Sequence, residues 1–273
     1  MKKLEKNTNV NILYLTTECN FDCSYCYEHL QDKVKKQMSK EDIKKAIDTV
    51  ITSEPADKQT LFVLFGGEAT LAWDGAKFAM DYAMSRKDNI VFNLETNGYR
   101  FKSTDFITDY INLPAYKANK LTLDISFDGL GNEERKLKSG KSVTKDLLII
   151  FRNLKVLKIP FRIRYTVHSK NINFLIQDFE AIEKTIQPER IIVSVAYETL
   201  QKTDRKILNE SKNIIIQKFL DKAIKTPICD WICEYCSGCS CRKEFNSYYN
   251  DEGNINKIKT SESAGKFKHF KEK

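Results

Sequence analysis

Residues 11–28 read NILYLTTECNFDCSYCYE. The first part, NILYLTT, is rich in apolar and β-branched residues, which is typical of a buried strand. Three cysteines follow it with the spacing C-x3-C-x2-C, at Cys19, Cys23 and Cys26. Such cysteines can be small buried side chains, a disulfide with one thiol left over, or metal ligands.

The expected cellular compartment bears on that choice. The N-terminus, MKKLEKNTNVN, lacks the apolar core of a secretory signal, and no stretch of the chain approaches the roughly 20 apolar residues of a membrane span. We therefore expect a cytoplasmic protein that does not enter the membrane. Thiols stay reduced in that compartment, which disfavours a disulfide framework and favours metal or redox roles.

The eight cysteines are also clustered. Three lie within residues 19–26 and five lie within residues 229–241, with none between the two groups. Cysteines used as ordinary core residues would not cluster in this way, so the pattern favours metal binding.

The composition is that of a folded globular protein. With 273 residues, of which 41% are hydrophobic and 30% charged, the chain can bury one large core. The net charge is +8, and part of it lies in the lysine-rich C-terminal tail. We interpret that tail as a solvated terminus rather than as a binding surface.

Six short apolar runs alternate with six amphipathic segments along most of the chain. The predicted strands span residues 11–18, 61–68, 90–98, 120–129, 161–168 and 190–198. The predicted helices span residues 39–51, 72–85, 103–112, 143–157, 171–185 and 204–224. The strands are apolar on both faces, which indicates a parallel sheet covered by helices.

Six β/α units are two fewer than the eight of a closed barrel. The predicted fold is therefore α/β, with a partial (β/α)6 barrel and, as the alternative, a flat doubly wound sheet. The alternation stops near Pro227. We place a domain boundary there, between a barrel of residues 1–226 and a small cysteine-rich C-terminal extension with a basic tail in residues 227–273.

The first cysteine group lies where such folds carry their chemistry. Parallel β/α folds place functional residues at the carboxyl ends of the strands, and these cysteines follow the first predicted strand. Three thiolates can bind three irons of a [4Fe–4S] cluster and leave the fourth iron open to a substrate or cofactor. A zinc site is the alternative, with His29 as the fourth ligand.

These features resemble the radical S-adenosylmethionine (SAM) enzymes. The resemblance rests on the cysteine spacing, on Tyr25 just before the third cysteine, and on FGGE at the end of the second predicted strand. It implies that Gly66, Gly67 and Glu68 hold the amino group of SAM. Two glycines permit close approach of the backbone, and a carboxylate suits an ammonium group.

Two further segments support the resemblance. ETNG lies at the end of the third predicted strand and supplies Asn97, and SFDG lies at the end of the fourth and supplies Ser126 and Asp128. The resemblance implies that these side chains contact the ribose and amino-acid parts of SAM, and that Arg135 contacts its carboxylate. It covers about residues 11–200 and implies a partial (β/α)6 barrel, in agreement with the count of units.

The second cysteine group has the pattern C-x3-C-x2-C-x2-C-x-C, at Cys229, Cys233, Cys236, Cys239 and Cys241. No predicted strand or GGE segment accompanies it, so we assign the cofactor to the first group. The extension resembles the SPASM and twitch domains of peptide- and protein-modifying radical SAM enzymes, which implies an auxiliary iron–sulfur cluster. Ile258 stands where the resemblance expects a further cysteine, so we expect one auxiliary cluster, with zinc or metal-free thiols as alternatives.

The resemblance implies an enzyme that cleaves SAM to methionine and a 5′-deoxyadenosyl radical, which then abstracts hydrogen from a peptide or protein. It also implies an external electron donor such as flavodoxin or ferredoxin. No catalytic residue is evident from the sequence. Only about ten residues precede the first predicted strand, so we expect the substrate to be recognised by the barrel, the extension or a separate protein.

Two other functions remain open. One is a radical SAM enzyme that acts on a small molecule. The other is a non-catalytic module whose basic, cysteine-rich C-terminus binds nucleic acid or a protein. The intact first cysteine group, together with GGE and ETNG, favours retained chemistry and makes a nucleic-acid partner the weaker hypothesis.

Overall fold

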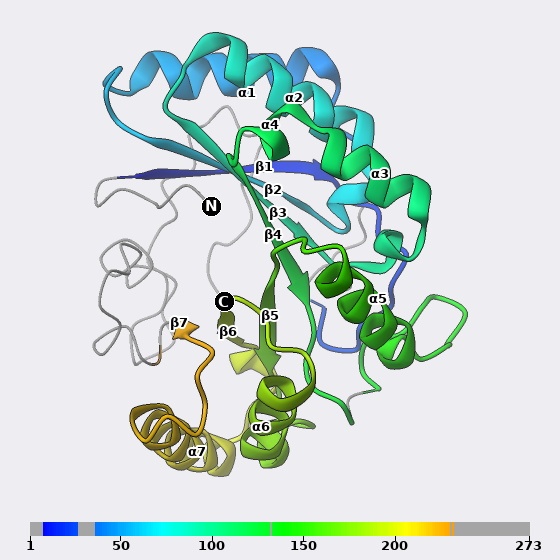
Figure 1. Cartoon of the computed structure of the whole chain (residues 1–273), viewed down its shortest axis with the longest axis vertical. Helices are drawn as coiled ribbons and strands as arrows, with labels where there is room; N and C mark the ends of the chain where they lie inside the picture. Colours follow the sequence, from blue (N-terminus) through cyan, green and yellow to red (C-terminus); the bar gives the residue numbers. More distant parts are fainter. Residues whose placement is uncertain (1–7, 27–35, 132, 230, 232–273) are drawn as a thin grey trace.

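The computed structural model describes residues 8–26, 36–131, 133–229 and 231. Within these ranges the chain alternates between strands and helices (Figure 1). Several residues that the sequence singled out lie outside the described ranges, namely His29, Cys233, Cys236, Cys239, Cys241 and Ile258.

Seven strands form one sheet among the described residues. They are β1 (Asn9–Thr16), β2 (Thr60–Gly66), β3 (Ile90–Thr96), β4 (Leu121–Ser126), β5 (Arg162–Val167), β6 (Ile191–Val195) and β7 (Ile228–Cys229). The strands stand in the sheet in the order of the chain, and each neighbouring pair is parallel. The predicted α/β class with a parallel sheet is confirmed.

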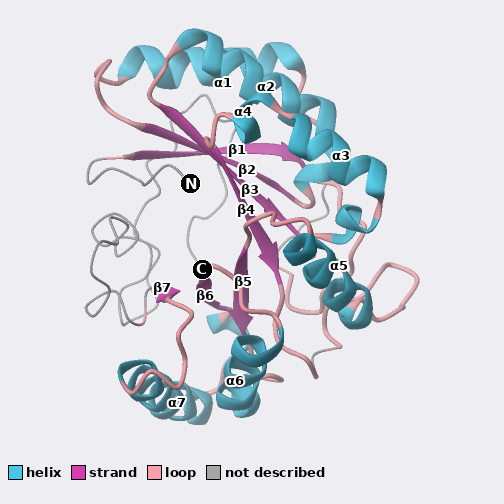
Figure 2. Ribbon diagram, in the orientation of Figure 1, coloured by secondary structure: helices cyan, strands magenta, loops and turns pink. Residues whose placement is uncertain are grey.

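Helices follow the strands and lie along the outer side of the curved sheet (Figures 1 and 2). The α-helices are α1 (Lys40–Ser53), α2 (Trp73–Arg86), α3 (Thr104–Asn112), α4 (Pro114–Lys117), α5 (Thr144–Val156), α6 (Leu175–Thr185) and α7 (Lys202–Leu220). Short 3-10 helices are η2 (Ala69–Ala72), η3 (Tyr99–Lys102), η4 (Ile172–Phe174) and η5 (Tyr197–Thr199). None of the described helices is long and apolar enough to cross a membrane.

The order of the strands distinguishes the two predicted architectures. A doubly wound sheet reverses its strand order at a switch point and carries helices on both faces. The unbroken order from β1 to β7, with the helices outside the curve, excludes that alternative and fits a partial barrel.

Side chains of each strand alternate between the two faces of the sheet. Outward residues such as Phe62 and Leu123 join the helices in the main hydrophobic core. Inward residues of β2 and β3 form a smaller apolar cluster of Leu61, Val63 and Val91. The larger core therefore lies between the sheet and the helices.

Strands β3 to β5 carry polar residues on the concave face. The Asn93 side chain donates to Asp124 Oδ2 at 3.0 Å, and Arg162 forms an ion pair with Asp124. Nearer the carboxyl ends, Arg164 pairs with Glu95 at 3.0 Å. Each of these charges has an oppositely charged partner, as burial of charge requires.

The sequence analysis missed β7. Ile228 and Cys229 pair with Ile191 and Ile192 of β6, so the sheet extends past the predicted boundary near residue 226. Two residues are too few to form an apolar run that can be recognised in a sequence. The division of the chain into a barrel and a cysteine-rich extension stays a prediction.

The predicted strands are longer than the observed ones at their carboxyl ends. β2 ends at Gly66, β4 at Ser126 and β6 at Val195. The residues that follow these strands form loops and short helices, and several predicted site residues lie there. The predicted strands included the first residues of these loops, namely 67–68 after β2, 127–129 after β4 and 196–198 after β6.

Candidate functional site

The predicted cofactor residues gather at the carboxyl ends of β1 to β5. Residues 17–26, which we name the cysteine loop, follow β1 and carry Cys19, Cys23 and Cys26. Cys23 is buried, and the other two thiols are partly buried. Parallel strands direct their carboxyl ends to one edge of the sheet, so residues far apart in the sequence meet at this loop.

The GGE segment holds one side of the cysteine loop. The N–H groups of Gly67 and Glu68 donate to the carbonyl oxygens of Thr16 and Glu18 at 2.8 and 2.7 Å. A Cβ on Gly66 would collide with the Thr16 carbonyl, and one on Gly67 would lie 2.5 Å from the Glu18 oxygen. The two glycines are therefore needed for the close approach of the two backbones.

A segment that follows β4 holds the other side of the cysteine loop. The N–H of Asp22 donates to the Lys136 carbonyl at 2.8 Å. Phe21 and Leu137 form an antiparallel bridge next to this bond, and the Phe21 side chain is buried. The loop is thus fixed from both sides by backbone hydrogen bonds.

The Glu68 side chain joins the ends of β2 and β3. It is 1% exposed, and its Oε1 accepts from Thr70 N–H at 3.0 Å and from the hydroxyls of Thr70 and Thr96 at 2.6 Å each. Its Oε2 accepts from the Asn97 N–H at 2.6 Å. These four bonds stabilise the carboxylate in its buried position.

Asn97 and Ser126 lie at the ends of the neighbouring strands β3 and β4. The Asn97 side chain donates to Asn20 Oδ1 at 2.7 Å and lies 3.9 Å from Cys19 Sγ. Its oxygen accepts from the Tyr99 N–H at 3.0 Å. Ser126 is the last residue of β4 and is partly exposed. Asn97 therefore contacts the cysteine loop directly.

Two thiols of the cysteine loop, those of Cys19 and Cys23, have raised pKa values. Burial raises the pKa of Cys19 to about 11 and that of Cys23 to about 12. Nearby donors oppose this effect: Phe21 N–H donates to Cys19 Sγ at 3.4 Å, and Arg135 Nη1 donates to Cys23 Sγ at 3.9 Å. Without a metal these side chains are thiols near neutral pH, so metal binding must displace their protons.

The donors of the cysteine loop fit an iron–sulfur cluster. Thiolates are soft ligands that select iron–sulfur clusters, zinc or Cu(I). The three thiols lie close together, since Cys26 contributes to the raised pKa of both Cys19 and Cys23. In the part of the chain that the structure describes, no group of three His, Cys, Asp or Glu side chains is placed to bind a single metal ion.

Asp128 and Arg135, both predicted to contact the cofactor, form a buried ion pair with each other. Arg135 Nε donates to Asp128 Oδ2 at 2.6 Å, and Nη2 donates to Oδ1 at 3.3 Å. The Tyr25 hydroxyl also donates to Oδ2, and the Thr166 N–H donates to Oδ1 at 2.9 Å. The Asp128 side chain is 0% exposed, so these interactions take place where water screens little.

The sequence analysis did not single out His168. Its buried ring stacks on Tyr25, with the centroids 4.6 Å apart and the planes at 19°. Lys170 N–H donates to His168 Nδ1 at 3.3 Å. Burial lowers the pKa of His168, so the ring is neutral near pH 7. Its place directly after β5, at the same edge as the predicted residues, is the signal that could have found it.

Glu95 was also missed, although it belongs to the ETNG segment. Burial raises the pKa of its carboxyl group, the Arg164 guanidinium opposes that rise, and the charge of Asp124 adds to it. Arg164 Nη1 lies 3.0 Å from Glu95 Oε1 and 3.5 Å from Asp124 Oδ2. The ion pair of Glu95 and Arg164 thus lies on the concave face, close to the predicted site.

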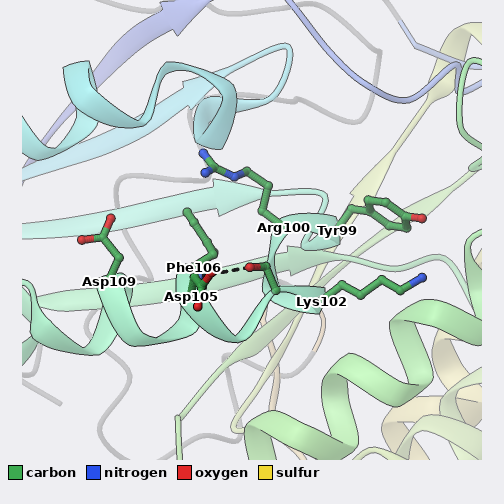
Figure 3. A pocket seen from close by; sticks show the side chains of 7 residues that line it. Tyr99, Arg100, Lys102, Asp105, Phe106 and Asp109 are labelled. Atoms are coloured by element: carbon green, nitrogen blue, oxygen red, sulfur yellow. Dashed lines mark hydrogen bonds between the residues drawn. The ribbon is translucent and has the colours of Figure 1, made fainter.

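A surface depression of about 570 Å³ lies apart from this site (Figure 3). Its walls come from η3 and the first turns of α3, where Arg100 lies over the Phe106 ring at 4.4 Å. No predicted cofactor residue lines it. The lining residues are Tyr99, Arg100, Lys102, Ser103, Asp105, Phe106 and Asp109.

Cys229 is the member of the second cysteine group that the structure describes. It is buried in β7, and Arg190 Nη1 donates to its Sγ at 3.4 Å. Ile228 before it belongs to the core on the helix side, so Cys229 lies on the concave face of the sheet.

Known proteins resemble this chain in sequence. A family model of the Radical SAM superfamily matches residues 13–183. Protein MJ0907 of Methanocaldococcus jannaschii is 32% identical over 168 residues, which are 60% of this chain and 54% of that protein. The sporulation killing factor maturation protein SkfB of Bacillus subtilis is 26% identical over 159 residues, which are 58% of this chain and 36% of SkfB. The chain thus spans about half the length of these curated relatives, or less.

Solved structures share the fold. Native anSMEcpe with bound AdoMet has a TM-score of 0.65 at 20% identity, over 81% of this chain and 64% of that one. The same protein with AdoMet and the Cp18Cys peptide has a TM-score of 0.63 at 18% identity, over 81% and 62%. Because the family match runs from within β1 to within α6, we conclude that the chain belongs to the Radical SAM superfamily.

Proposed function

We propose that this protein is an enzyme that cleaves SAM reductively and modifies a peptide or protein with the resulting radical. The observation that carries the proposal is the cysteine loop, which the GGE segment holds on one side and the segment carrying the Asp128–Arg135 pair holds on the other. A [4Fe–4S] cluster on Cys19, Cys23 and Cys26 would supply the electron that breaks a carbon–sulfur bond of SAM, which gives methionine and a 5′-deoxyadenosyl radical.

The chain's own groups would bind and orient the cofactor. Gly66 and Gly67 leave no side chain at the strand end, which allows a ligand to approach the backbone. Ser126, partly exposed at the end of β4, offers a hydroxyl to the ribose. Arg135 binds Asp128 through Nε and Nη2, and one N–H of Nη1 faces Cys23, which leaves the remaining N–H groups of the guanidinium for the carboxylate of SAM. Glu68, Asn97 and Tyr25 complete the proposed set.

A peptide or protein substrate is favoured by the relatives. SkfB is named as a maturation protein, and anSMEcpe binds AdoMet together with a peptide. The concave face offers partly buried apolar side chains on β1 and β2, among them Ile12 and Phe65, and also the charged pair of Glu95 and Arg164 on β3 and β5. A peptide offers both kinds of group to such a surface. A small-molecule substrate is the alternative.

We also propose an auxiliary iron–sulfur cluster in the extension of residues 227–273. Five cysteines are available for the four ligands of a closed cluster. Cys229, on the concave face of β7, would place this cluster beside the edge of the sheet. Such a cluster would transfer electrons or anchor the substrate, and an external donor such as flavodoxin or ferredoxin would supply the electron for SAM cleavage.

The experiment that tests the proposed chemistry uses anaerobically purified protein loaded with iron and sulfide. With dithionite and SAM, we expect methionine and 5′-deoxyadenosine in equal amounts. Protein that holds a reducible cluster and yet forms neither product would contradict the proposal. Protein that holds one zinc ion and no iron would instead support the non-catalytic binding module.

The substrate class needs a separate experiment. Short peptides encoded beside this gene are the candidates to test, with the mass of each peptide measured before and after incubation. We expect a mass change that requires SAM and reductant. If no such peptide changes while a small molecule consumes SAM in proportion, the alternative substrate class is correct.

A further inference from the structure

The Asp128 carboxylate is occupied by the protein itself. Oδ2 accepts from Arg135 Nε at 2.6 Å and from the Tyr25 hydroxyl, and Oδ1 accepts from Arg135 Nη2 at 3.3 Å and from Thr166 N–H at 2.9 Å. The side chain is 0% exposed. Both oxygens of this buried carboxylate are therefore engaged by the protein, and Arg135 provides two of the four hydrogen bonds.

We propose that Asp128 is a positioning residue that fixes Arg135 and Tyr25 against the cysteine loop, so that one guanidinium nitrogen faces the sulfur of Cys23. This inference rests on the proposed function, because it concerns the same cluster site. It gives Asp128 a role that differs from direct contact with SAM.

Three contacts fix the guanidinium plane of Arg135. Two of its nitrogens form the fork on Asp128, and the third, Nη1, lies 3.9 Å from Cys23 Sγ. Its central carbon lies 5.5 Å from the centroid of the Tyr25 ring, within the range of a cation–π contact. Because the guanidinium is planar and rigid, the fork on Asp128 determines where Nη1 points.

Tyr25, which belongs to the cysteine loop, connects this loop to the Asp128 carboxylate. It lies directly before Cys26, and its ring contacts both the guanidinium of Arg135 and the stacked ring of His168. Its hydroxyl reaches Asp128, which follows β4. Asp128 thus joins the cysteine loop to the ends of β4 and β5, the latter through Thr166 N–H.

A cation held beside a cluster ligand has a defined electronic effect. Hydrogen bonds to the sulfurs and the net charge around a cluster are among the properties that set its reduction potential. The positive charge of Arg135 beside Cys23 stabilises the added electron of the reduced cluster. We therefore expect Arg135 to make the reduction potential of the cluster less negative than it would be without the arginine.

A double-mutant cycle tests the inference. The midpoint potential of the loaded cluster is measured by EPR-monitored titration in the wild type, Asp128→Asn, Arg135→Gln and the double variant. Arg135→Gln should shift the potential to a more negative value. With Gln at 135, Asp128→Asn removes a negative charge and should shift the potential to a less negative value. With Arg135 present, Asp128→Asn also releases the arginine from its position beside Cys23. The shift of the potential should therefore be smaller than with Gln at 135, or reversed in sign.

The size of the coupling decides the outcome. If Asp128→Asn shifts the potential equally with Arg135 and with Gln at that position, Asp128 acts independently and the proposal is wrong. A wild-type protein without a reducible cluster would instead contradict the proposed function. The iron content and the EPR signal of the wild type therefore distinguish the two failures.

Two further variants keep the test decisive. Asp178→Asn is the matched control, because this buried carboxylate accepts from the Tyr165 hydroxyl at 2.7 Å and from Leu130 N–H at 3.2 Å. It should lower the melting temperature and leave the cluster potential near that of the wild type. If the Asp128→Asn variant does not take up iron, the Arg135→Lys variant is used for the test instead.

Arg135→Lys keeps the positive charge and removes the fork. A lysine cannot bind both carboxylate oxygens and also face Cys23, since its charge is a single ammonium group. The potential should therefore shift toward that of Arg135→Gln. A wild-type potential in Arg135→Lys would overturn the proposal, because the fork would then be unnecessary.

Discussion

The carboxylate of Glu68, after β2, accepts a hydrogen bond from the backbone N–H of Asn97, after β3, at 2.6 Å. The other oxygen of the carboxylate accepts from Thr70 and Thr96. The side chain that we propose as a ligand for the SAM ammonium therefore also joins two strand ends. Replacing it should affect both stability and cofactor binding, and the two effects can be separated.

Glu68→Gln keeps the size of the side chain and replaces one acceptor oxygen by a donor. That donor would face the N–H of Asn97 or the donors of Thr70 and Thr96, so we expect a lower melting temperature. We also expect SAM binding to weaken by about 1.5–3 kcal/mol, the range for a hydrogen bond that involves a charged group. Equilibrium titration of the loaded protein measures the affinity, and the iron content should not change.

Glu54→Gln is the control for this prediction. The buried Glu54 carboxylate accepts from the Thr60 hydroxyl at 2.5 Å and from Asn11 at 3.2 Å, away from the carboxyl ends of the strands. It should lower the melting temperature without changing the affinity for SAM. If Glu68→Gln behaves in the same way, Glu68 has only a structural role.

The backbone contact of Gly67 predicts a loss of cluster binding in Gly67→Ala. The new Cβ would lie 2.5 Å from the Glu18 carbonyl oxygen, so the start of the cysteine loop must move next to Cys19. We expect a large drop in iron content and a destabilisation of about 1–3 kcal/mol, as for overpacked sites. Gly131→Ala is the control, since no atom of a described residue other than its chain neighbours lies within 4 Å of its added Cβ. Equal iron contents in the two variants would contradict the prediction.

The buried carboxyl group of Glu95 predicts a dependence of stability on pH. Burial raises its pKa in the folded state against the opposing effect of Arg164, so the folded protein holds this proton at pH values where the unfolded chain has lost it. The contribution to stability is therefore present below the unfolded pKa of about 4.5 and falls as the pH rises through the folded pKa. The charges that face Glu95 are those of Arg164, Asp124 and Arg162.

Urea denaturation of the wild type and Glu95→Gln at several pH values measures this effect. The stability of the wild type relative to the variant should decrease from about pH 4.5 upward. A difference that stays constant with pH, or that grows in favour of the wild type, would show that Arg164 outweighs burial.

The second cysteine group predicts one dispensable thiol. A closed cluster needs four ligands and five cysteines are present, so we expect either Cys239 or Cys241, separated by one residue, to be the spare. Single alanine variants with iron analysis identify it. Loss of Cys229, Cys233 or Cys236 should remove the auxiliary iron and stop peptide modification, while uncoupled SAM cleavage continues. Unchanged iron in all five single variants would argue against an auxiliary cluster.

The order of elements and the location of the site could be predicted from the sequence. Runs such as LFVLF in β2 are apolar on both faces, which occurs in parallel sheets covered by helices. Because the carboxyl ends of parallel strands meet at one edge, the positions of Cys19, Glu68, Asn97 and Asp128 after successive strands implied one shared site.

The pairings within the site could not be predicted. The spacing of Asp128 and Arg135 does not reveal that each is the other's partner, because their contact depends on the path of the intervening loop. Glu68 likewise binds groups on a neighbouring strand, which a periodic pattern does not report. His168 belongs to no motif, and only the folded sheet brings its ring onto Tyr25.

The central claim is that the cysteine loop after β1, and not the second cysteine group, binds the cluster that cleaves SAM. The measurement that tests it most directly is the formation of 5′-deoxyadenosine by protein in which Cys19, Cys23 and Cys26 are all replaced by alanine. We predict no 5′-deoxyadenosine from this variant, with the iron of the second group still bound. Formation of 5′-deoxyadenosine at the wild-type rate would contradict the account.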